Sequence, residues 1–184
     1  MALGAYFDAV LAAARRGSAW AWEALFRDLA GPIAGFARSR KAPEPDDILQ
    51  ETFLAAARDL HRFEGDEAAF RAWIFTIAHR RVADAFRKSG REVPRVDRES
   101  AEAEAELRWQ GDVEREAMSM MSFLEVSAIV RSLSAAQRDV LLLRVVGDLS
   151  VADTARILDK SEGTVRALQS RALKSLREEL VDDE

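Results

Sequence analysis

The chain of 184 residues carries 27 lysines and arginines against 32 aspartates and glutamates and is 48% hydrophobic, which is typical of a soluble protein with one medium or two small domains. The absence of cysteine excludes disulfides, thiolate metal sites and thiol nucleophiles, and suits a reducing cytoplasm. No apolar run approaches the roughly 18 residues of a membrane span, and the N-terminal stretch has the wrong polarity for a signal peptide, because Asp8 lies within it and Arg15 and Arg16 follow it. We therefore expect a cytoplasmic protein without membrane insertion.

Apolar residues recur at helical spacing along the first part of the chain, and strand-like alternation of useful length is absent, which predicts an all-α fold. A first helix is expected from about Tyr6 to Arg16, and a second follows Gly17 and Ser18 until Gly31 and Pro32 interrupt it. A third begins near Pro45, because proline is tolerated in a helical first turn. Two acids then follow near the positive end of the helix dipole: Asp46 and Asp47.

After a loop from about His61 to Asp66, a long helix is predicted to run to Lys88. Trp73 could serve as a stacking platform for a base, but its helical spacing with the neighbouring apolar residues favours a place in the core. The same helix carries four cations against one acid, Asp84; the cations are Arg80, Arg81, Arg87 and Lys88.

The middle of the chain is acidic. Residues 89–127 contain 5 cations and 10 anions, whereas residues 1–88 contain 13 and 12, and residues 128–184 contain 9 and 10. Gly90 and Pro94 break the start of this segment, so we expect it to be mobile, although the Ala- and Glu-rich stretch from Ala101 to Glu116 favours a helix. The methionines between Met118 and Met121 are expected to pack at the junction with the next domain.

The last part of the chain begins with an expected helix through Ile129 and Val130. A capping box formed by Ser134 and Gln137 then predicts a helix from about Ala135 to Val146.

Two short helices joined by a tight polar turn follow between Leu149 and Leu176. Ser150 is expected to cap the first, which would bury Ala152, Ala155 and Leu158. Asp159 and Lys160 form the turn, and Ser161 caps a second helix with the buried face Val165, Leu168, Ala172 and Leu176. Such a pair is a helix-turn-helix, which places its second helix in the major groove of DNA.

Local charge agrees with DNA binding, since residues 156–177 hold six cations and two anions. The alternative is that these cations only solvate the outer face of an amphipathic helix.

At two places the sequence resembles the extracytoplasmic-function, or group IV, sigma factors of bacterial RNA polymerase. The stretches PDDILQETFLAAARDLHRF and FRAWIFTIAHRRVADAFRK resemble their region 2, and LSAAQRDVLLLRVVGDLSVADTARILDKSEGTVRALQSRAL resembles their region 4. The resemblance implies two small helical domains, region 2 at residues 1–88 and region 4 at residues 128–184, joined by a flexible acidic linker at residues 89–127. It also implies an alternative sigma factor that binds core RNA polymerase and promoter DNA, directs transcription initiation, and has an anti-sigma factor as a partner.

The resemblance further assigns roles to individual residues. Docking on core polymerase would use Asp46, Asp47, Gln50, Glu51 and Phe53. Recognition and melting of the −10 element would use His61, Arg62, Phe63, Arg80, Arg81, Asp84, Arg87 and Lys88. Recognition of the −35 element would use Ser161, Glu162, Thr164, Arg166, Ser170, Arg171 and Lys174. The acidic linker would lie toward the RNA exit path, either as a mimic of nucleic acid or as a solvated spacer.

Three residues depart from the usual family pattern in the helix-turn-helix. Asp159 stands where glycine is usual, Lys160 where an apolar residue is usual, and Thr154 where isoleucine is common. Because aspartate tolerates the left-handed conformation, we expect the turn to survive with a somewhat poorer core between its helices.

Other classes of protein fit the sequence less well. Only His61 and His79 could serve as imidazole bases or metal ligands, without a second histidine or paired carboxylate at ligand spacing, so no catalysis, cofactor or metal site is expected. The main alternative is a stand-alone helix-turn-helix regulator with an N-terminal helical sensor domain, which would bind promoter DNA by itself. A sigma factor would bind DNA weakly alone and tightly once joined to core polymerase.

Overall fold

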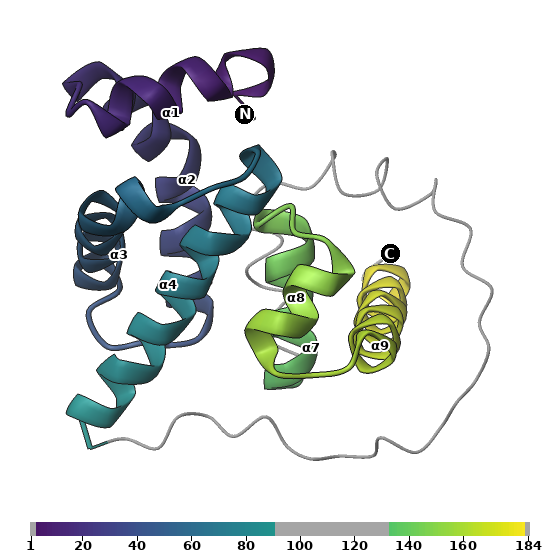
Figure 1. Ribbon diagram of the computed structural model, residues 1–184. Coiled ribbons are helices and arrows are strands. Elements are labelled where there is room, and N and C mark those ends of the chain that lie inside the picture. The colour runs from purple at the N-terminus through teal and green to yellow at the C-terminus, as the bar shows by residue number, and fades with distance from the viewer. Residues whose placement is uncertain (1–2, 91–132, 183–184) are drawn as a thin grey trace.

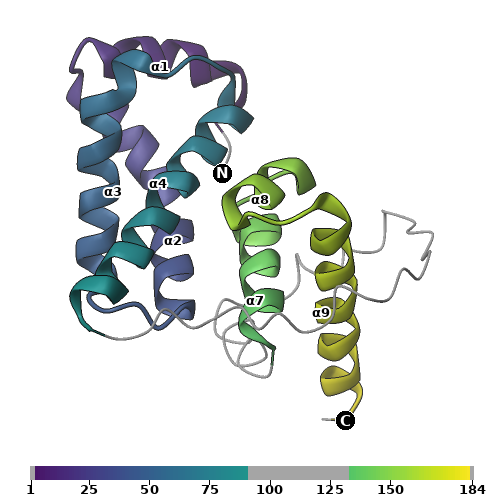
Figure 2. The same ribbon diagram turned by 60° about the horizontal axis from the view of Figure 1, so that its bottom comes forward.

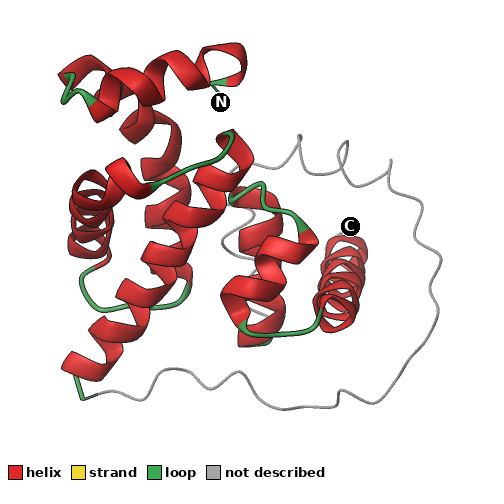
Figure 3. Cartoon of the chain, viewed as in Figure 1, coloured by secondary structure: helices red, strands yellow, loops and turns green. Residues whose placement is uncertain are grey.

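The computed structural model describes residues 3–90 and 133–182. Within these ranges every regular element is a helix (Figure 3), which confirms the predicted all-α fold. The expected linker from Arg91 on, its methionines and the helix through Ile129 and Val130 lie outside the described residues. The elements in chain order are η1 (Gly4–Tyr6), α1 (Phe7–Arg15), α2 (Ala19–Ser39), α3 (Pro45–Asp59), η2 (Leu60–Arg62), α4 (Glu67–Lys88), α7 (Ala135–Leu141), η3 (Leu142–Val146), α8 (Val151–Leu158) and α9 (Glu162–Asp182).

Helices α1 to α4 form a first module, in which α4 packs against both α2 and α3 (Figure 1). Its core holds the largest fully buried side chains of the described chain, among them Phe36, Phe70 and Phe75. Trp73 is half-buried and stacks on Phe63 with 5.2 Å between ring centroids, which confirms its predicted place in the core.

The expected interruption at Gly31 and Pro32 is wrong, because α2 continues through Pro32 to Ser39. Proline removes one intrahelical hydrogen bond and disfavours a helix interior by about 3 kcal/mol. Packing outweighs that cost here, since Leu29 before the proline and Ile33 after it are both fully buried on the same helix face.

Helices α7, α8 and α9 form a second module. The predicted capping box is present, with the Gln137 amide donating to Ser134 Oγ at 3.3 Å and the Ser134 amide donating to Gln137 Oε1 at 3.0 Å. The expected helix from Ala135 to Val146 changes to a wider π-helical turn, η3, at Leu142. Val140 packs against Ala155 of α8 and joins the second module's core.

The helix-turn-helix has the predicted caps. Ser150 Oγ accepts from the Asp153 amide at 3.0 Å, and Ser161 Oγ accepts from the Thr164 amide at 3.1 Å. Asp159 adopts the expected left-handed conformation, with φ of 53°.

The predicted burial of Ala152 is wrong, since this residue is exposed. Because α8 begins at Val151, its inner face repeats three or four residues later at Thr154 and Ala155, while Ala152 lies about 100° round the helix.

The two modules are in contact (Figure 2). Leu142, Leu143 and Leu149 belong to the same buried cluster as the core of the first module, and α8 packs against α4. This contact between modules was not predicted from the sequence.

Candidate nucleic-acid and protein interfaces

The outer face of α3 presents four polar side chains of the expected polymerase-docking set, all exposed: Asp46, Asp47, Gln50 and Glu51. Asp46 forms an ion pair with Arg38 at 2.9 Å, so its negative charge is partly compensated within the module. Phe53 is half-buried and packs on Phe26 with 4.8 Å between ring centroids. Beside it, Leu54 is 70% exposed. The α3 face is therefore an apolar patch bordered by acids, the composition that suits docking on another protein.

Leu54 is absent from the expected set, although the sequence carries a signal for it. The buried positions of α3 include Ile48, Thr52, Ala55 and Ala56, and Leu54 lies off that stripe. A large apolar residue off the buried stripe of a surface helix is a candidate for contact with another protein where it adds to a neighbouring apolar side chain, as Leu54 adds to Phe53.

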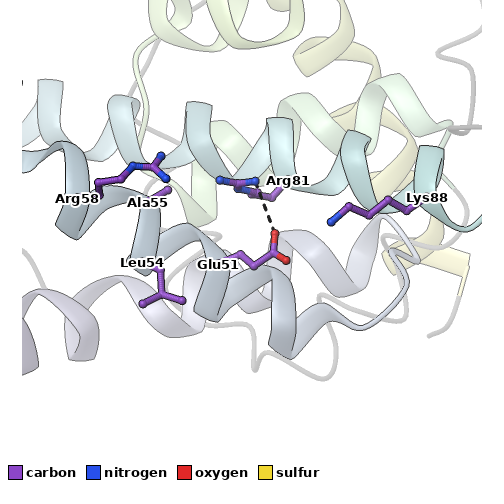
Figure 4. A pocket seen from close by; sticks show the side chains of 6 residues that line it. All are labelled: Glu51, Leu54, Ala55, Arg58, Arg81 and Lys88. Carbon is purple, nitrogen blue, oxygen red and sulfur yellow. Dashed lines mark ion pairs between the residues drawn. The ribbon is translucent and has the colours of Figure 1, made fainter.

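A groove between α3 and α4 is lined by Glu51, Leu54, Ala55, Arg58, Arg81 and Lys88. Its three cations follow one another along the groove, and Arg81 Nη1 lies 3.7 Å from Glu51 Oε2 (Figure 4). This ion pair joins a residue of the expected polymerase-docking set to one of the expected −10 set. Arg58 was missing from both sets.

The loop before α4 is held firmly in place. Phe63, expected to contact DNA, is only 7% exposed, and its ring lies against Phe70 and Trp73 in the core, so it anchors the loop from inside. Arg15 donates to the Phe63 carbonyl oxygen, and Asp66 Oδ1 caps α4 by accepting from the Ala69 amide at 2.8 Å.

His61 and Arg62, which were expected in a loop, are exposed and lie in the 3-10 turn η2 instead. His61 Nδ1 donates a hydrogen bond to the Arg58 carbonyl oxygen at 3.0 Å. Of the three residues expected to contact the −10 element here, only His61 and Arg62 are therefore exposed enough to reach DNA.

Helix α4 presents Arg80, Arg87 and Lys88 to solvent, while Arg81 is half-buried against Glu51 and Asp84 pairs with Arg87. Burial, with smaller contributions from the charges of Arg40 and Arg80, lowers the pKa of His79 to about 4. This histidine is therefore neutral at pH 7, so the positive charge of the helix comes from its arginines and Lys88.

On the recognition helix α9 and the residue before it, five of the seven expected −35 residues are exposed and two, Thr164 and Ser170, are half-buried; the exposed ones are Ser161, Glu162, Arg166, Arg171 and Lys174. Glu162 pairs with Arg166 at 2.7 Å, and Glu178 lies 3.8 Å from Lys174. Arg171 has no ion-pair partner among the described residues. A base contact by Arg171 would therefore break no ion pair of the described residues, whereas one by Arg166 would compete with Glu162.

In the described ranges, 3–90 and 133–182, no cluster of three histidine or acidic side chains is arranged to hold a metal ion. None of the described helices combines the length and the apolar character that crossing a membrane requires.

Two family models match the chain, one along the first module and one along the second. Residues 25–92 match the family model of sigma-70 region 2, and residues 123–176 match that of sigma-70 region 4.

Among curated proteins, the chain is 32% identical to the ECF RNA polymerase sigma factor SigD of Mycobacterium tuberculosis, over 97% of this chain and 85% of SigD. It is 31% identical to the ECF RNA polymerase sigma factor SigX of Bacillus subtilis, over 77% of this chain and 76% of SigX.

Two solved structures share the fold. One is the sigma factor RpoE of Bartonella quintana in complex with the anti-sigma factor NepR, which is 28% identical with a TM-score of 0.60 and covers 88% of this chain and 97% of that one. The other is CnrH in complex with the cytosolic domain of CnrY, which is 26% identical with a TM-score of 0.59 and covers 95% of this chain and 97% of that one. The chain therefore belongs to the sigma-70 family, in its extracytoplasmic-function group, and is an alternative sigma factor that directs transcription initiation.

Proposed function

We propose that this sigma factor acts in the cytoplasm as a promoter-specificity subunit without catalysis of its own, and that it docks on core RNA polymerase through the outer face of α3. The observation that carries the proposal is that two cationic surfaces lie on separate modules that match region 2 and region 4 in family order. Asp47, Gln50 and Glu51 orient the docking electrostatically, and the neighbouring Leu54 supplies apolar contact.

In this proposal the first module, over residues 1–88, opens the −10 element. A strand that leaves the duplex needs cations along its phosphates, and Arg80, Arg87 and Lys88 are exposed on one helix. His61 and Arg62 lie in η2, before the N-terminus of this helix, and the next residue, Phe63, anchors the loop in the core, so the loop is preformed and loses little freedom on binding.

The second module, over residues 128–184, reads the −35 element with the start of α9. Arg171 can pair bidentately with guanine, while Ser161 and Thr164 suit phosphate contacts. The Ser161 and Thr164 hydroxyls lie 2.8 Å apart, next to the helix N-terminus, where a phosphate is favoured.

An anti-sigma factor is the proposed regulatory partner. The similar solved structures described above are the sigma factor RpoE in complex with the anti-sigma factor NepR and CnrH in complex with the cytosolic domain of CnrY. Similarity over most of this chain supports the same kind of partner here.

The docking proposal is tested by titrating the fluorescently labelled full chain with purified core polymerase. The double variant Asp47→Ala/Glu51→Ala should bind at least about tenfold more weakly, because it removes two charges from the proposed interface. Glu23→Ala is the matched control, since Glu23 is an exposed acid on α2 that forms an ion pair with Arg27. Equal weakening by both variants, or none by the double variant, would move the docking surface away from α3.

The stand-alone regulator is tested in the same series. Duplex genomic fragments are added to the chain with and without core polymerase. Tight binding without polymerase would favour the regulator, whereas a sigma factor should bind tightly only with polymerase present.

A further inference from the structure

The N-terminal segment, residues 3–15, contacts both ends of the loop that precedes α4. At the start of this loop, Arg15 of α1 donates from Nη2 to the Phe63 carbonyl oxygen. At its end, the Glu67 carboxylate accepts from two successive backbone amides of the segment, at 2.6 Å to Oε1 and 2.8 Å to Oε2. Figure 2 shows α1 beside the loop and the N-terminus near the first turn of α4. The segment therefore holds the loop at two points.

The contact at Glu67 is an anion-binding nest of the backbone. Leu3 has right-handed helical angles, with φ of −69° and ψ of −22°, and Gly4 after it is left-handed, with φ of 54°. This succession turns neighbouring amides toward the same side, where together they bind an anion. Hydrogen bonds to a charged acceptor are stronger than those between neutral groups. Glycine suits the second position because it adopts a positive φ at no steric cost.

The loop has few backbone contacts of its own. In the described part of the chain, the amides of Glu64, Gly65 and Asp66 donate to no other backbone group. Besides the buried ring of Phe63 and the cap that Asp66 provides for α4, the loop therefore depends on the N-terminal segment for its shape.

The N-terminal segment is itself fixed in the core of the first module. Phe7 is 3% exposed, and its ring centroid lies 5.6 Å from that of Phe70 in α4. Leu3 packs against the same core. At the other end of α1, the Ala14 carbonyl oxygen accepts from Trp22 Nε1 of α2 at 3.2 Å. A segment that is anchored at both ends can restrain the loop that it contacts.

We propose that the N-terminal segment fixes the loop before α4 in the shape in which the first module opens the −10 element, with Arg15 and Glu67 as positioning residues. His61 and Arg62 directly precede this loop, so its shape sets where they lie relative to the cations of α4. A loop that adopts the binding shape in only a fraction of molecules weakens binding by that fraction. The effect on promoter opening rests on the proposed function, whereas the restraint of the loop does not.

The first measurement is the mobility of the loop in the full chain. Because the chain has no cysteine, a single spin label can be attached at Glu64→Cys, an exposed position in the loop. Its electron paramagnetic resonance spectrum should be that of an ordered label in the otherwise unchanged protein. Arg15→Ala and Glu67→Gln should each make the label more mobile, because each weakens one of the two attachments. Unchanged mobility in both variants would overturn the proposal.

Further variants test each attachment separately. Gly4→Ala should free the loop as Glu67→Gln does, because alanine disfavours the left-handed backbone of the nest, although its Cβ would meet no atom within 4 Å. Arg15→Lys should restore most of the order, since lysine keeps a donor for the Phe63 carbonyl.

Arg16→Ala is the matched control for Arg15→Ala. Arg16 is exposed like its neighbour, and its side chain forms no hydrogen bond or ion pair within residues 3–90 and 133–182. Its replacement should leave the label ordered. If Arg16→Ala frees the loop as much as Arg15→Ala does, the assignment of Arg15 is wrong.

The second measurement is promoter opening. The probe is a genomic DNA fragment on which the unchanged chain and core polymerase start transcription, and permanganate oxidation of thymines measures the unpaired fraction. Arg15→Ala and Glu67→Gln should lower this fraction about three- to tenfold, as fewer molecules hold the loop in its binding shape. Affinity for core polymerase should stay unchanged, because neither residue belongs to the proposed docking face of α3. An equal loss of that affinity would indicate a general folding defect and overturn the positioning role.

Glu64→Gln separates positioning from simple charge. It removes an exposed acid from the same loop, as Glu67→Gln removes an acid from its end, but it leaves the nest intact. If charge alone mattered, both variants would open the promoter more readily, because each removes a negative charge near the phosphates. Positioning predicts that only Glu67→Gln reduces opening. Increased opening by Glu67→Gln would contradict the assignment of Glu67.

The two measurements distinguish this inference from the proposed function. If the unchanged chain opens no fragment with core polymerase, the proposed function fails, and the spin label still decides whether the N-terminal segment holds the loop. Greater loop mobility with undiminished promoter opening would overturn the role of Arg15 and Glu67 at the −10 element. Greater mobility together with reduced opening is the result that the proposal predicts.

Discussion

Thr154 in the helix-turn-helix should be replaceable by valine with a gain in stability. The residue is fully buried, and its Oγ1 has no hydrogen-bond partner among the described residues. Leaving a buried hydroxyl without a partner costs about 1–3 kcal/mol, and valine has the same shape without the hydroxyl. We therefore expect Thr154→Val to raise the free energy of unfolding by about 1–2 kcal/mol.

The matched control is Thr52→Val on α3. Thr52 is equally buried, but its Oγ1 donates to the Ile48 carbonyl oxygen at 2.7 Å. Its loss should lower the free energy of unfolding by about 1 kcal/mol. Both variants are measured by urea unfolding followed by circular dichroism, with the slope m unchanged. If Thr154→Val destabilises the protein as Thr52→Val does, the Thr154 hydroxyl is hydrogen-bonded and the reasoning fails.

Three further predictions concern the His79 ring, the loop before α4 and the recognition helix. The pKa of His79 is lowered to about 4 in the folded protein, so the unfolded chain takes up a proton at this histidine first as the pH falls. The free energy of unfolding therefore decreases as the pH falls from about 6.5 toward 4. The free energies of unfolding of wild type and His79→Gln, measured in urea at pH 7 and pH 5, should differ by about 2 kcal/mol more in favour of the variant at pH 5 than at pH 7. The same difference at both pH values would place His79 in water. Gly65→Ala should lower the melting temperature, because Gly65 has φ of 145° and an added Cβ would lie 2.8 Å from Ala69 Cβ; an unchanged melting temperature would mean that the loop adapts. Arg171→Ala should weaken promoter recognition by about 1–3 kcal/mol in a transcription competition between promoters, and an unchanged promoter preference would remove Arg171 from the −35 set.

Local features of the fold could be predicted from the sequence because a few neighbouring residues determine them. The caps at Ser134, Ser150 and Ser161 need only a hydroxyl three residues before a backbone amide, and all three form as expected. The left-handed turn at Asp159 is likewise a local property.

Predictions failed where packing with distant residues decides the outcome. Pro32 disfavours a helix locally, but burial of Leu29 and Ile33 keeps α2 continuous. Phe63, which the family resemblance assigns to the −10 set, is instead buried, because its ring packs against Phe70 and Trp73.

The contact between modules has a partial signal in the sequence, which shows that α7 needs a second partner but not which one. The run Val140 to Leu143 is apolar on every side of a helix, which requires two partners, and the adjacent Asp139 is a charge beside that run. A single sequence does not show that Arg40, 99 positions away, supplies its counter-charge.

Transcription of fragmented genomic DNA by purified core polymerase, with and without this chain and with sequencing of the RNA 5′ ends, tests the central claim most directly. As a sigma factor with two DNA-reading modules, the chain should create new start sites that share two spaced upstream motifs. If no new start sites appear while the chain binds duplex DNA without polymerase, it acts as a stand-alone regulator and the account is contradicted.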